Sequence, residues 1–478
     1  MASKTHSRSN NIKIIIVLGM FSFLGSISGS STNLALPQMS KDLMVSNGQS
    51  TWIVQIGLIT SAILLVMWGH LGDLLSKNAI FLYGGVIFVI GSGLTGIAPV
   101  FWLVLAGRFI QAIGISMIQA NSLGITTDYF SDDHRAEALA VISMFISVGA
   151  ISGPAIGGFI LSIASWRWIF LINVPLMLIV IYIGFRVMPL PQESFASFRH
   201  ATQGANWFGQ NIFTIGMILF FISSPFIQQQ SYVIGFILLA VGLALTLFYF
   251  YQDDGAKNPW ISPEILHNKR YMVSITALML VMLVNAISNI LLPFYFQSYG
   301  GISPFFSGLL IMLQSVAMLC TTPIAGVLAD KFNREAMTIV GLIVLVVSQV
   351  MYASFGRALD YPLIIGAIVL NGIGMAIFLS PNNALTMGLV PKQLTGVAGS
   401  FNTFARTFGM TIGISFGSAL LFSQLPGVRR ISPALGMQFM SAFTNVFWVA
   451  TALSVLTLVL VVLRFFTSRK RAKIAVKA

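Results

Sequence analysis

Two arginines lie inside long apolar segments of the chain, Arg108 in the segment 101–126 and Arg406 in the segment 395–423. A guanidinium keeps its charge at every physiological pH and offers five N–H donors in a fixed fork, so it can form bidentate hydrogen bonds that an ammonium cannot. Because a charged residue within a membrane span costs several kcal/mol, both arginines are functional candidates by default. The alternative for Arg108 is a side chain that carbonyl groups hold for packing alone. The alternative for Arg406 is a side chain that extends to the cytoplasmic end of its span.

Uncharged amides in similar segments are the other candidates to line a polar path through a membrane, because an amide both donates and accepts hydrogen bonds. The amides expected to line the substrate and proton pathway are Asn33, Gln55, Gln111, Asn285, Asn289 and Gln314. Further amides of the same kind are Gln297, Asn371, Asn382 and Asn383. Near Arg406, the residues Asn402, Gly409 and Gly413 recur at helical spacing, which predicts a polar stripe beside a glycine stripe.

All thirteen acidic residues fall in loops or near the ends of apolar segments. Asp128 is the one nearest to the interior of a span, and we include it in the predicted pathway as a proton carrier. The alternative is a loop carboxylate paired with His134 or Arg135, since an isolated carboxylate rarely stays ionised in apolar surroundings. The 22 Met and 38 Phe residues provide soft and aromatic surface that suits a promiscuous site, although most of them must face lipid or core.

A glycine-rich stretch is expected to position these side chains. Gly149, Gly153 and Gly157 follow one another at steps of four residues, with Gly158 next to the last of them. This spacing leaves one face of a helix without side chains, so that a neighbouring backbone can approach closely. Pro154 removes a helical hydrogen bond and bends the axis. We therefore expect a packing and hinge element here.

The composition excludes a soluble globular protein, because 56% of the residues are hydrophobic and only 8% are charged. Apolar segments of spanning length fall at 13–36, 50–70, 78–96, 101–126, 136–163, 168–187, 207–226, 232–251, 271–296, 305–328, 336–355, 362–386, 395–423 and 437–466. If the N-terminus is cytoplasmic, nineteen basic residues, Arg464 among them, fall in cytoplasmic loops and five fall outside. This asymmetry accounts for the net charge of +13 without nucleic-acid binding and places both termini in the cytoplasm.

An internal repeat sets the predicted architecture. The sequence Leu34-Ala35-Leu36-Pro37 is followed by the turn Gly69–Asp73, and Ile290-Leu291-Leu292-Pro293 is followed at nearly the same distance by the turn Gly326–Asp330. We therefore expect an all-α membrane protein with fourteen transmembrane helices. A six-helix bundle occupies residues 1–200, two inserted central helices with their linkers occupy residues 201–260, and a second six-helix bundle occupies residues 261–478.

Two adjacent motifs carry a resemblance to a known family. Ser152–Gly158 resembles the antiporter motif in the fifth helix of major facilitator exporters. Trp166–Pro175 resembles the start of the sixth helix in their fourteen-helix drug:proton antiporter branch. The stretch Leu105–Gly114 is similar to the motif of the fourth helix, which implies that Arg108 faces the central cavity and assists proton or substrate handling.

The turns Gly69–Asp73 and Gly326–Asp330 resemble the loop pattern Gly-x-Leu-Ala-Asp-Arg-x-Gly-Arg of this family. An Asp at this place can cap a helix start or bind a basic neighbour, so Asp73 and the set Asp330, Lys331 and Arg334 are interpreted as latches that release during the conformational change. The alternative is simple anchoring of the loop. The first copy departs from the pattern, with Leu74 in place of Arg and Ser76 in place of Gly.

A second departure concerns the first helix. Family members that export cations commonly carry an Asp a few residues before a sequence like Asn33-Leu34-Ala35-Leu36-Pro37, and here the corresponding residue is Ser28. The resemblance implies a secondary active transporter that exports amphipathic drugs or related small molecules by alternating access, in exchange for protons. The missing acid favours an alternative, an exporter or facilitator of a specific metabolite or lipid without proton coupling. A membrane sensor built like a transporter is a third possibility.

The sequence contains no zinc-protease, phosphate-loop or nucleophile-elbow motif, so we expect neither an enzyme nor a bound cofactor or metal. The expected partners are an amphipathic small molecule, protons and the lipid bilayer. We expect a monomer that spans a bacterial cell membrane many times and does not bind nucleic acid.

Overall fold

The computed structural model of the protein describes residues 8–130, 132–190, 206–255, 263–391 and 395–475. Within these residues every regular element is helical, and fourteen stretches are long and apolar enough to cross a membrane. The predicted all-α membrane fold is therefore confirmed, whereas the side of the membrane on which the termini lie stays a prediction.

The chain divides into two compact units. Unit 1 comprises Met1–Val45, Trp52–Phe220 and Val241–Trp260, and unit 2 comprises Ser46–Thr51, Phe221–Ala240 and Ile261–Ala478. The helices α10 (Trp207–Gln228) and α11 (Tyr232–Asp254) correspond to the two predicted central helices, and each of them is divided between the units. The predicted three-part division at residues 200 and 260 stays a prediction.

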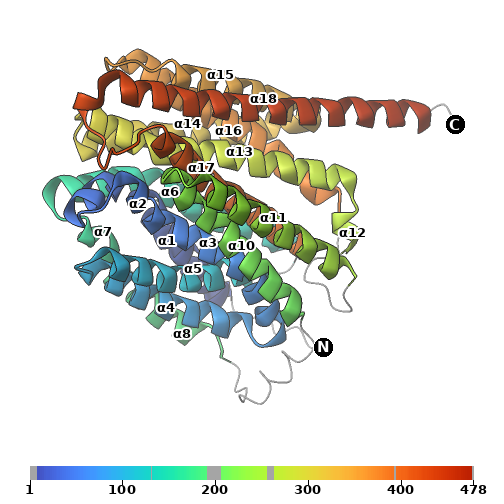
Figure 1. Cartoon of the computed structure of the whole chain (residues 1–478). Coiled ribbons are helices and arrows are strands. Elements are labelled where there is room, and N and C mark those ends of the chain that lie inside the picture. Colours follow the sequence, from blue (N-terminus) through green and yellow to red (C-terminus); the bar gives the residue numbers. More distant parts are fainter. Residues whose placement is uncertain (1–7, 131, 191–205, 256–262, 392–394, 476–478) are drawn as a thin grey trace. The chain divides into compact units, whose positions relative to one another are not determined.

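The other helices of unit 1 are α1 (Arg8–Asp42), α3 (Trp52–Leu74), α4 (Lys77–Ile97), α5 (Phe101–Tyr129), α6 (Asp132–Ile163), α7 (Arg167–Leu171) and α8 (Asn173–Val187). α7 and α8 together form one span. In Figure 1 α4 and α5 run side by side, and they form one of the most extensive helix pairs in this unit. The remaining principal pairs are α1 with α6, α3 with α5, α4 with α8 and α1 with α8.

The other helices of unit 2 are α2 (Asn47–Ser50), α12 (Pro263–Leu266), α13 (Lys269–Pro293), η1 (Phe294–Tyr299), α14 (Pro304–Lys331), α15 (Arg334–Ala353), α16 (Tyr361–Gly388), α17 (Thr395–Ser423), η3 (Pro433–Leu435) and α18 (Gly436–Ala475). Their principal pairs are α15 with α16, α13 with α17, α14 with α16, α15 with α18 and α13 with α18. Figure 1 shows α15 and α18 side by side. When the six spans α1 to α8 of unit 1 and the six spans α13 to α18 of unit 2 are each numbered along the chain, the five pairs join spans of the same numbers in both units. The internal repeat of the sequence is therefore also a repeat of helix packing.

Equivalent turns of the two units end in a side-chain cap. Ser76 Oγ accepts a hydrogen bond from the N–H of Ala79 and caps α4, and Asn333 Oδ1 accepts one from the N–H of Glu335 at 2.8 Å and caps α15. A cap satisfies an N–H group that has no partner within the helix. Ser76, at the place of the glycine in the family pattern, therefore serves as a helix cap.

Candidate functional site

The guanidinium of Arg108 lies at the centre of a buried group of polar side chains that we call the Arg108 cluster. Arg108 Nε donates a hydrogen bond to the carbonyl oxygen of Ile53 on α3 at 3.0 Å, and one Nη donates to Gln111 Oε1 on the next turn of α5. Gln111 Nε2 in turn donates to Ser92 Oγ on α4 at 2.6 Å and to Ser28 Oγ on α1 at 3.4 Å. The cluster therefore connects four helices of unit 1.

The cluster holds a permanent charge with uncharged partners. Arg108 is only 8% exposed, and in the described residues no carboxylate lies within ion-pair distance of it. The ring of Phe170 on α7 lies 5.6 Å from the guanidinium carbon and adds a cation–π contact. A charge at the centre of a span costs about 3 kcal/mol, and hydrogen bonds to a charged group each contribute about 1.5–3 kcal/mol. The bonds to Ile53 and Gln111 are enough to keep the arginine inside the bundle.

Ser28 and Ser92 are members of the cluster that our site prediction from sequence left out. Both side chains are buried, at 1% and 0% exposed. Serine is common in membrane helices as a small packing residue, so its type carries no signal of a site. The sequence marks Ser28 only as the position of the missing acid, and Ser92 is identified only by its distance from Gln111.

The other pathway residues predicted in unit 1 lie in three different surroundings. Asn33 is half-buried on α1, and its Oδ1 has no hydrogen-bond partner within the described ranges. Gln55 is completely buried on α3. Asp128, at the end of α5, has 53% of its side chain exposed and pairs with Lys77 Nζ at 3.0 Å. The side chains of His134 and Arg135, its expected alternative partners, lie outside the described part of the chain.

The predicted residues of unit 2 form two separate groups. Gln314 Nε2 on α14 donates to Asn285 Oδ1 on α13 at 2.6 Å, and Asn289 is half-buried one turn farther along α13. Asn402 on α17 donates at 3.4 Å to Thr386 Oγ1 on α16. Arg406 is half-buried one turn after Asn402, and the structure gives it no hydrogen bond or ion pair with another described residue.

A second buried guanidinium belongs to Arg464, which is predicted from sequence to lie in a cytoplasmic loop. Arg464 lies within α18 and is 7% exposed. One Nη donates to Ser274 Oγ on α13, and Nε lies 4.0 Å from Glu335 Oε1 on α15. These contacts hold three helices of unit 2 together, which indicates a packing role. The apolar segment 437–466 already contained Arg464, so the assignment to a loop was wrong.

Asp253 is a buried carboxylate that our site prediction also left out. It lies at the end of α11 and is 0% exposed. Asn206 Nδ2 donates to its Oδ1 at 3.2 Å, and Asn206 also donates to Gln252 Oε1 at 3.0 Å. Its position at a helix end gives it the same sequence context as the acids that are expected in loops.

The glycines of α6 lie against α1. A Cβ atom added to Gly149 would come 2.7 Å from the carbonyl oxygen of Phe23, and one added to Gly157 would come 2.8 Å from Ser31 Cβ. One added to Gly153 would overlap Ser30 Oγ. The Ser31 hydroxyl also donates to the carbonyl of Gly153 at 2.7 Å. Pro154 lies within α6, next to this contact. The two backbones therefore approach closely along these turns, and Gly158 is buried beside them.

The turn motifs are described only in part. A Cβ on Gly69 or Gly326 would meet its nearest neighbour at 4.0 or 3.9 Å, so neither glycine is needed for close packing. Arg334 is the first residue of α15 and is exposed. The side chains of Asp73 and Asp330 lie outside the described part of the structure, so their role as latches stays a prediction. Within the described residues no three His, Cys, Asp or Glu side chains are grouped in a way that could hold a metal ion.

A family model and several known proteins are similar to this chain in sequence. A family model described as Major Facilitator Superfamily matches residues 17–414 and 274–477. The riboflavin transporter RibZ of Clostridioides difficile (strain 630) is 26% identical over 464 residues, which cover 97% of this chain and 98% of RibZ. The multidrug efflux pump SdrM of Staphylococcus aureus (strain N315) is 27% identical, with 85% of this chain and 89% of SdrM covered.

Among solved structures, the chain is similar to a bacterial homologue of the human lysosomal transporter Spinster in an inward-facing, unoccupied conformation. The TM-score is 0.65, the sequence identity is 15%, and the match covers 96% of this chain and 98% of that one. At this identity the likeness concerns the fold alone.

Proposed function

The chain belongs to the major facilitator superfamily, and on this premise we propose that it exports amphipathic drugs or related small molecules by alternating access, in exchange for protons. It is a multi-pass protein of a bacterial cell membrane. The observation that carries the proposal is the Arg108 cluster, in which a buried charge is held only by uncharged groups. Such a charge can attract a polar or anionic part of a substrate. The similarity to SdrM supports a drug as the substrate.

A second candidate is an exporter or facilitator of a specific metabolite that works without protons. Two observations favour it. RibZ, a riboflavin transporter, matches nearly the whole chain. In addition, the acidic side chains that the structure describes lie at or beyond the ends of the membrane spans. A carboxylate within a span is the usual carrier of protons in transporters, so its absence from the described spans weakens the argument for proton exchange.

Transport by purified protein in lipid vesicles separates the two candidates. An imposed pH gradient that drives uptake of a fluorescent amphiphile into inverted vesicles would support drug:proton antiport. Exchange of riboflavin or a related metabolite that proceeds equally with and without the gradient would support the second candidate. If neither occurs for a panel of cationic, neutral and anionic compounds, both transport proposals are wrong.

Asp253 and Asp128 both lie near helix ends, but their surroundings differ. The Asp253 carboxylate is buried and accepts a hydrogen bond from Asn206, whereas the Asp128 carboxylate is exposed and forms a surface ion pair with Lys77. We expect Asp253→Asn to uncouple substrate movement from the pH gradient and Asp128→Asn to keep the coupling within about twofold. Vesicles with a fixed pH gradient and a pH-sensitive dye measure both fluxes. Loss of coupling in Asp128→Asn alone would reverse this assignment.

The charge preference of transport is expected to follow from the cluster. A permanent cation that leaves water for a cavity needs a compensating carboxylate, and Ser28 and Asn33 on α1 offer only dipoles. Arg108 would also repel it. We therefore expect neutral, zwitterionic and anionic amphiphiles to be exported better than quaternary ammonium dyes.

Ser28→Asp tests this preference, because Ser28 Oγ lies 3.4 Å from Gln111 Nε2 and a carboxylate there would join the Arg108 cluster. We expect the variant to export quaternary ammonium compounds better than the unmodified protein does, measured as efflux from intact cells. The matched control is Ser28→Asn, which adds a similar volume without the charge. Strong export of these cations by the unmodified protein, or an equal gain in Ser28→Asn, would contradict the electrostatic argument.

A further inference from the structure

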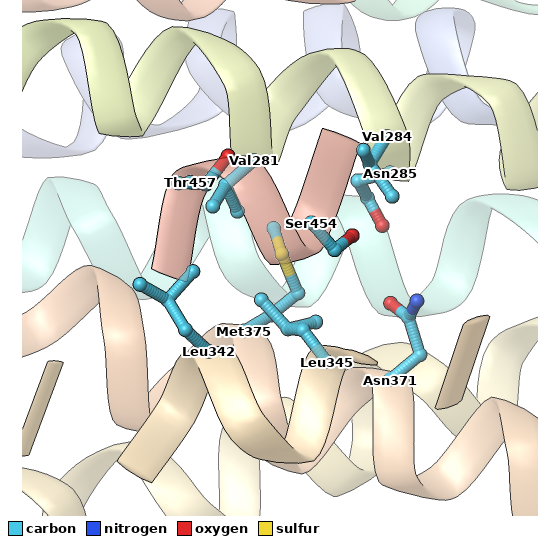
Figure 2. A pocket seen from close by; sticks show the side chains of 9 residues that line it. All are labelled: Val281, Val284, Asn285, Leu342, Leu345, Asn371, Met375, Ser454 and Thr457. Atoms are coloured by element: carbon cyan, nitrogen blue, oxygen red, sulfur yellow. The ribbon is translucent and has the colours of Figure 1, made fainter. Parts of the chain in front are cut away.

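Unit 2 contains a small internal cavity between α13, α15, α16 and α18. Its lining residues are Val281, Val284, Asn285, Leu342, Leu345, Asn371, Met375, Ser454 and Thr457. Figure 2 shows that the amides of Asn285 and Asn371 point toward each other at one end of this group, and that the Met375 side chain extends into its middle. The cavity volume is about 10 Å³, which is the space that one water molecule requires.

Asn371 has a buried amide without a partner. The residue is 0% exposed, and neither Oδ1 nor Nδ2 forms a hydrogen bond with any other described residue. An amide in this situation loses the hydrogen bonds that it made to water and gains none in return. The nearby amide of Asn285 does not satisfy it: Asn285 Oδ1 accepts a hydrogen bond from Gln314 at 2.6 Å, and no hydrogen bond joins the two asparagines.

The other polar groups of the lining complete a set of hydrogen-bonding positions. The hydroxyls of Ser454 and Thr457 donate to the carbonyls of Ala450 and Leu453 at 2.9 and 2.8 Å, so each keeps lone pairs that can accept a bond. The NH₂ group of Asn371 offers donors, and its carbonyl oxygen is an acceptor. A buried water typically makes two to four hydrogen bonds to such groups.

We propose that this cavity binds one structural water molecule that Asn371 holds. The lining contains no charged side chain, so its chemistry fits a neutral ligand and not a metal ion, which would need carboxylates or several more oxygens. An apolar ligand would leave the Asn371 amide unpaired. The water connects α13, α16 and α18, and the bond between Gln314 and Asn285 extends the connection to α14. The proposal does not depend on the substrate or on proton coupling.

Pulsed X-ray radiolysis of the full-length protein in detergent tests the site. Irradiation splits water into hydroxyl radicals, which oxidise a methionine next to a bound water even when it is closed to solvent. Met375 lines the cavity, whereas Met282 belongs to the same hydrophobic cluster without lining it, and both are 3% exposed. We expect Met375 to be oxidised at least about threefold faster than Met282, as measured by mass spectrometry of the peptides. Equal rates would show a dry cavity and overturn the proposal.

The variant Asn371→Leu distinguishes a bound water from an empty cavity by whether the midpoint of thermal unfolding falls or rises. If the water is present, leucine removes its holder, lowers the midpoint of thermal unfolding by about 2–4 °C and reduces Met375 oxidation to the rate of Met282. If the cavity is dry, leucine removes an unsatisfied amide and fills a void, so the midpoint rises and the oxidation rates do not change. The second result would overturn the proposal, and the comparison in the unmodified protein stands even if the variant does not fold.

Discussion

Replacement of Arg108 by lysine is expected to reduce gradient-driven transport by about tenfold or more, although the positive charge is kept. The guanidinium donates to the Ile53 carbonyl through Nε and to Gln111 through Nη, so it spans two helices with a fixed fork. An ammonium on a flexible chain cannot reproduce both directions. The measurement is initial transport rate in reconstituted vesicles, with the amount of protein in the membrane determined in parallel.

The matched control for this variant is Arg186→Lys. Arg186 is exposed near the end of α8, and it donates a hydrogen bond to the hydroxyl of Tyr182 on its own helix at 3.1 Å. We expect this control to transport at the rate of the unmodified protein. If Arg108→Lys does so as well, the arginine is held by carbonyl groups for packing alone, which is the alternative that the sequence leaves open.

Gly157→Leu is expected to abolish transport while the protein still reaches the membrane. A Cβ at this position would lie 2.8 Å from Ser31 Cβ and 3.1 Å from Ser31 Cα, and backbone atoms of α1 cannot turn aside as a long side chain can. Overpacking of this kind costs about 1–3 kcal/mol, and it separates two helices that must stay in contact as the transporter changes conformation. Transport assays and membrane fractions of the same cells measure the two effects separately.

A milder pair of variants tests the same contact. Gly157→Ala adds only the clashing Cβ, and Gly93→Ala adds the same atom on α4, where the nearest neighbour is Val174 Cγ2 at an ordinary 3.9 Å. We expect Gly93→Ala to behave like the unmodified protein and Gly157→Ala to transport several times more slowly. Full activity of Gly157→Leu would contradict the assignment of α6 as a close-packing hinge.

The structure also changes the effects that we expect from replacing two charged residues, Arg464 and Asp253. Arg464 is predicted from sequence in a loop, but its side chain contacts Ser274 on α13 and lies near Glu335 on α15. We therefore expect its replacement to reduce the stability of unit 2 first. Asp253 also resembles a loop residue in sequence and is buried in the structure, but we expect its replacement to affect transport. Near the end of a membrane helix, the position of a residue in the sequence does not show whether its side chain is buried, because the helix can end inside or outside the packed bundle.

Several properties follow from the sequence by itself. Hydropathy is a local property, and a span needs about 20 apolar residues, so the fourteen helices are predicted from windows of that length. The repeat of the proline-ended helix and the Asp turn predicts two similar bundles, and the same five helix pairs occur in each unit. The motifs at Ser152–Gly158 and Trp166–Pro175 identify the superfamily as a pair, because either of them alone could be glycine-rich membrane packing.

Only the tertiary structure decided which polar groups meet. Gln111 contacts Ser28 and Ser92 because α1 and α4 present those residues to α5, and Asn371 borders a cavity because α13 and α18 do not fill the space beside it. Lipid tails are as apolar as a protein core, so the apolar face of a membrane helix does not show which side is buried. The rotation of each helix, and with it the partners of each polar side chain, is therefore set by packing that no single segment contains.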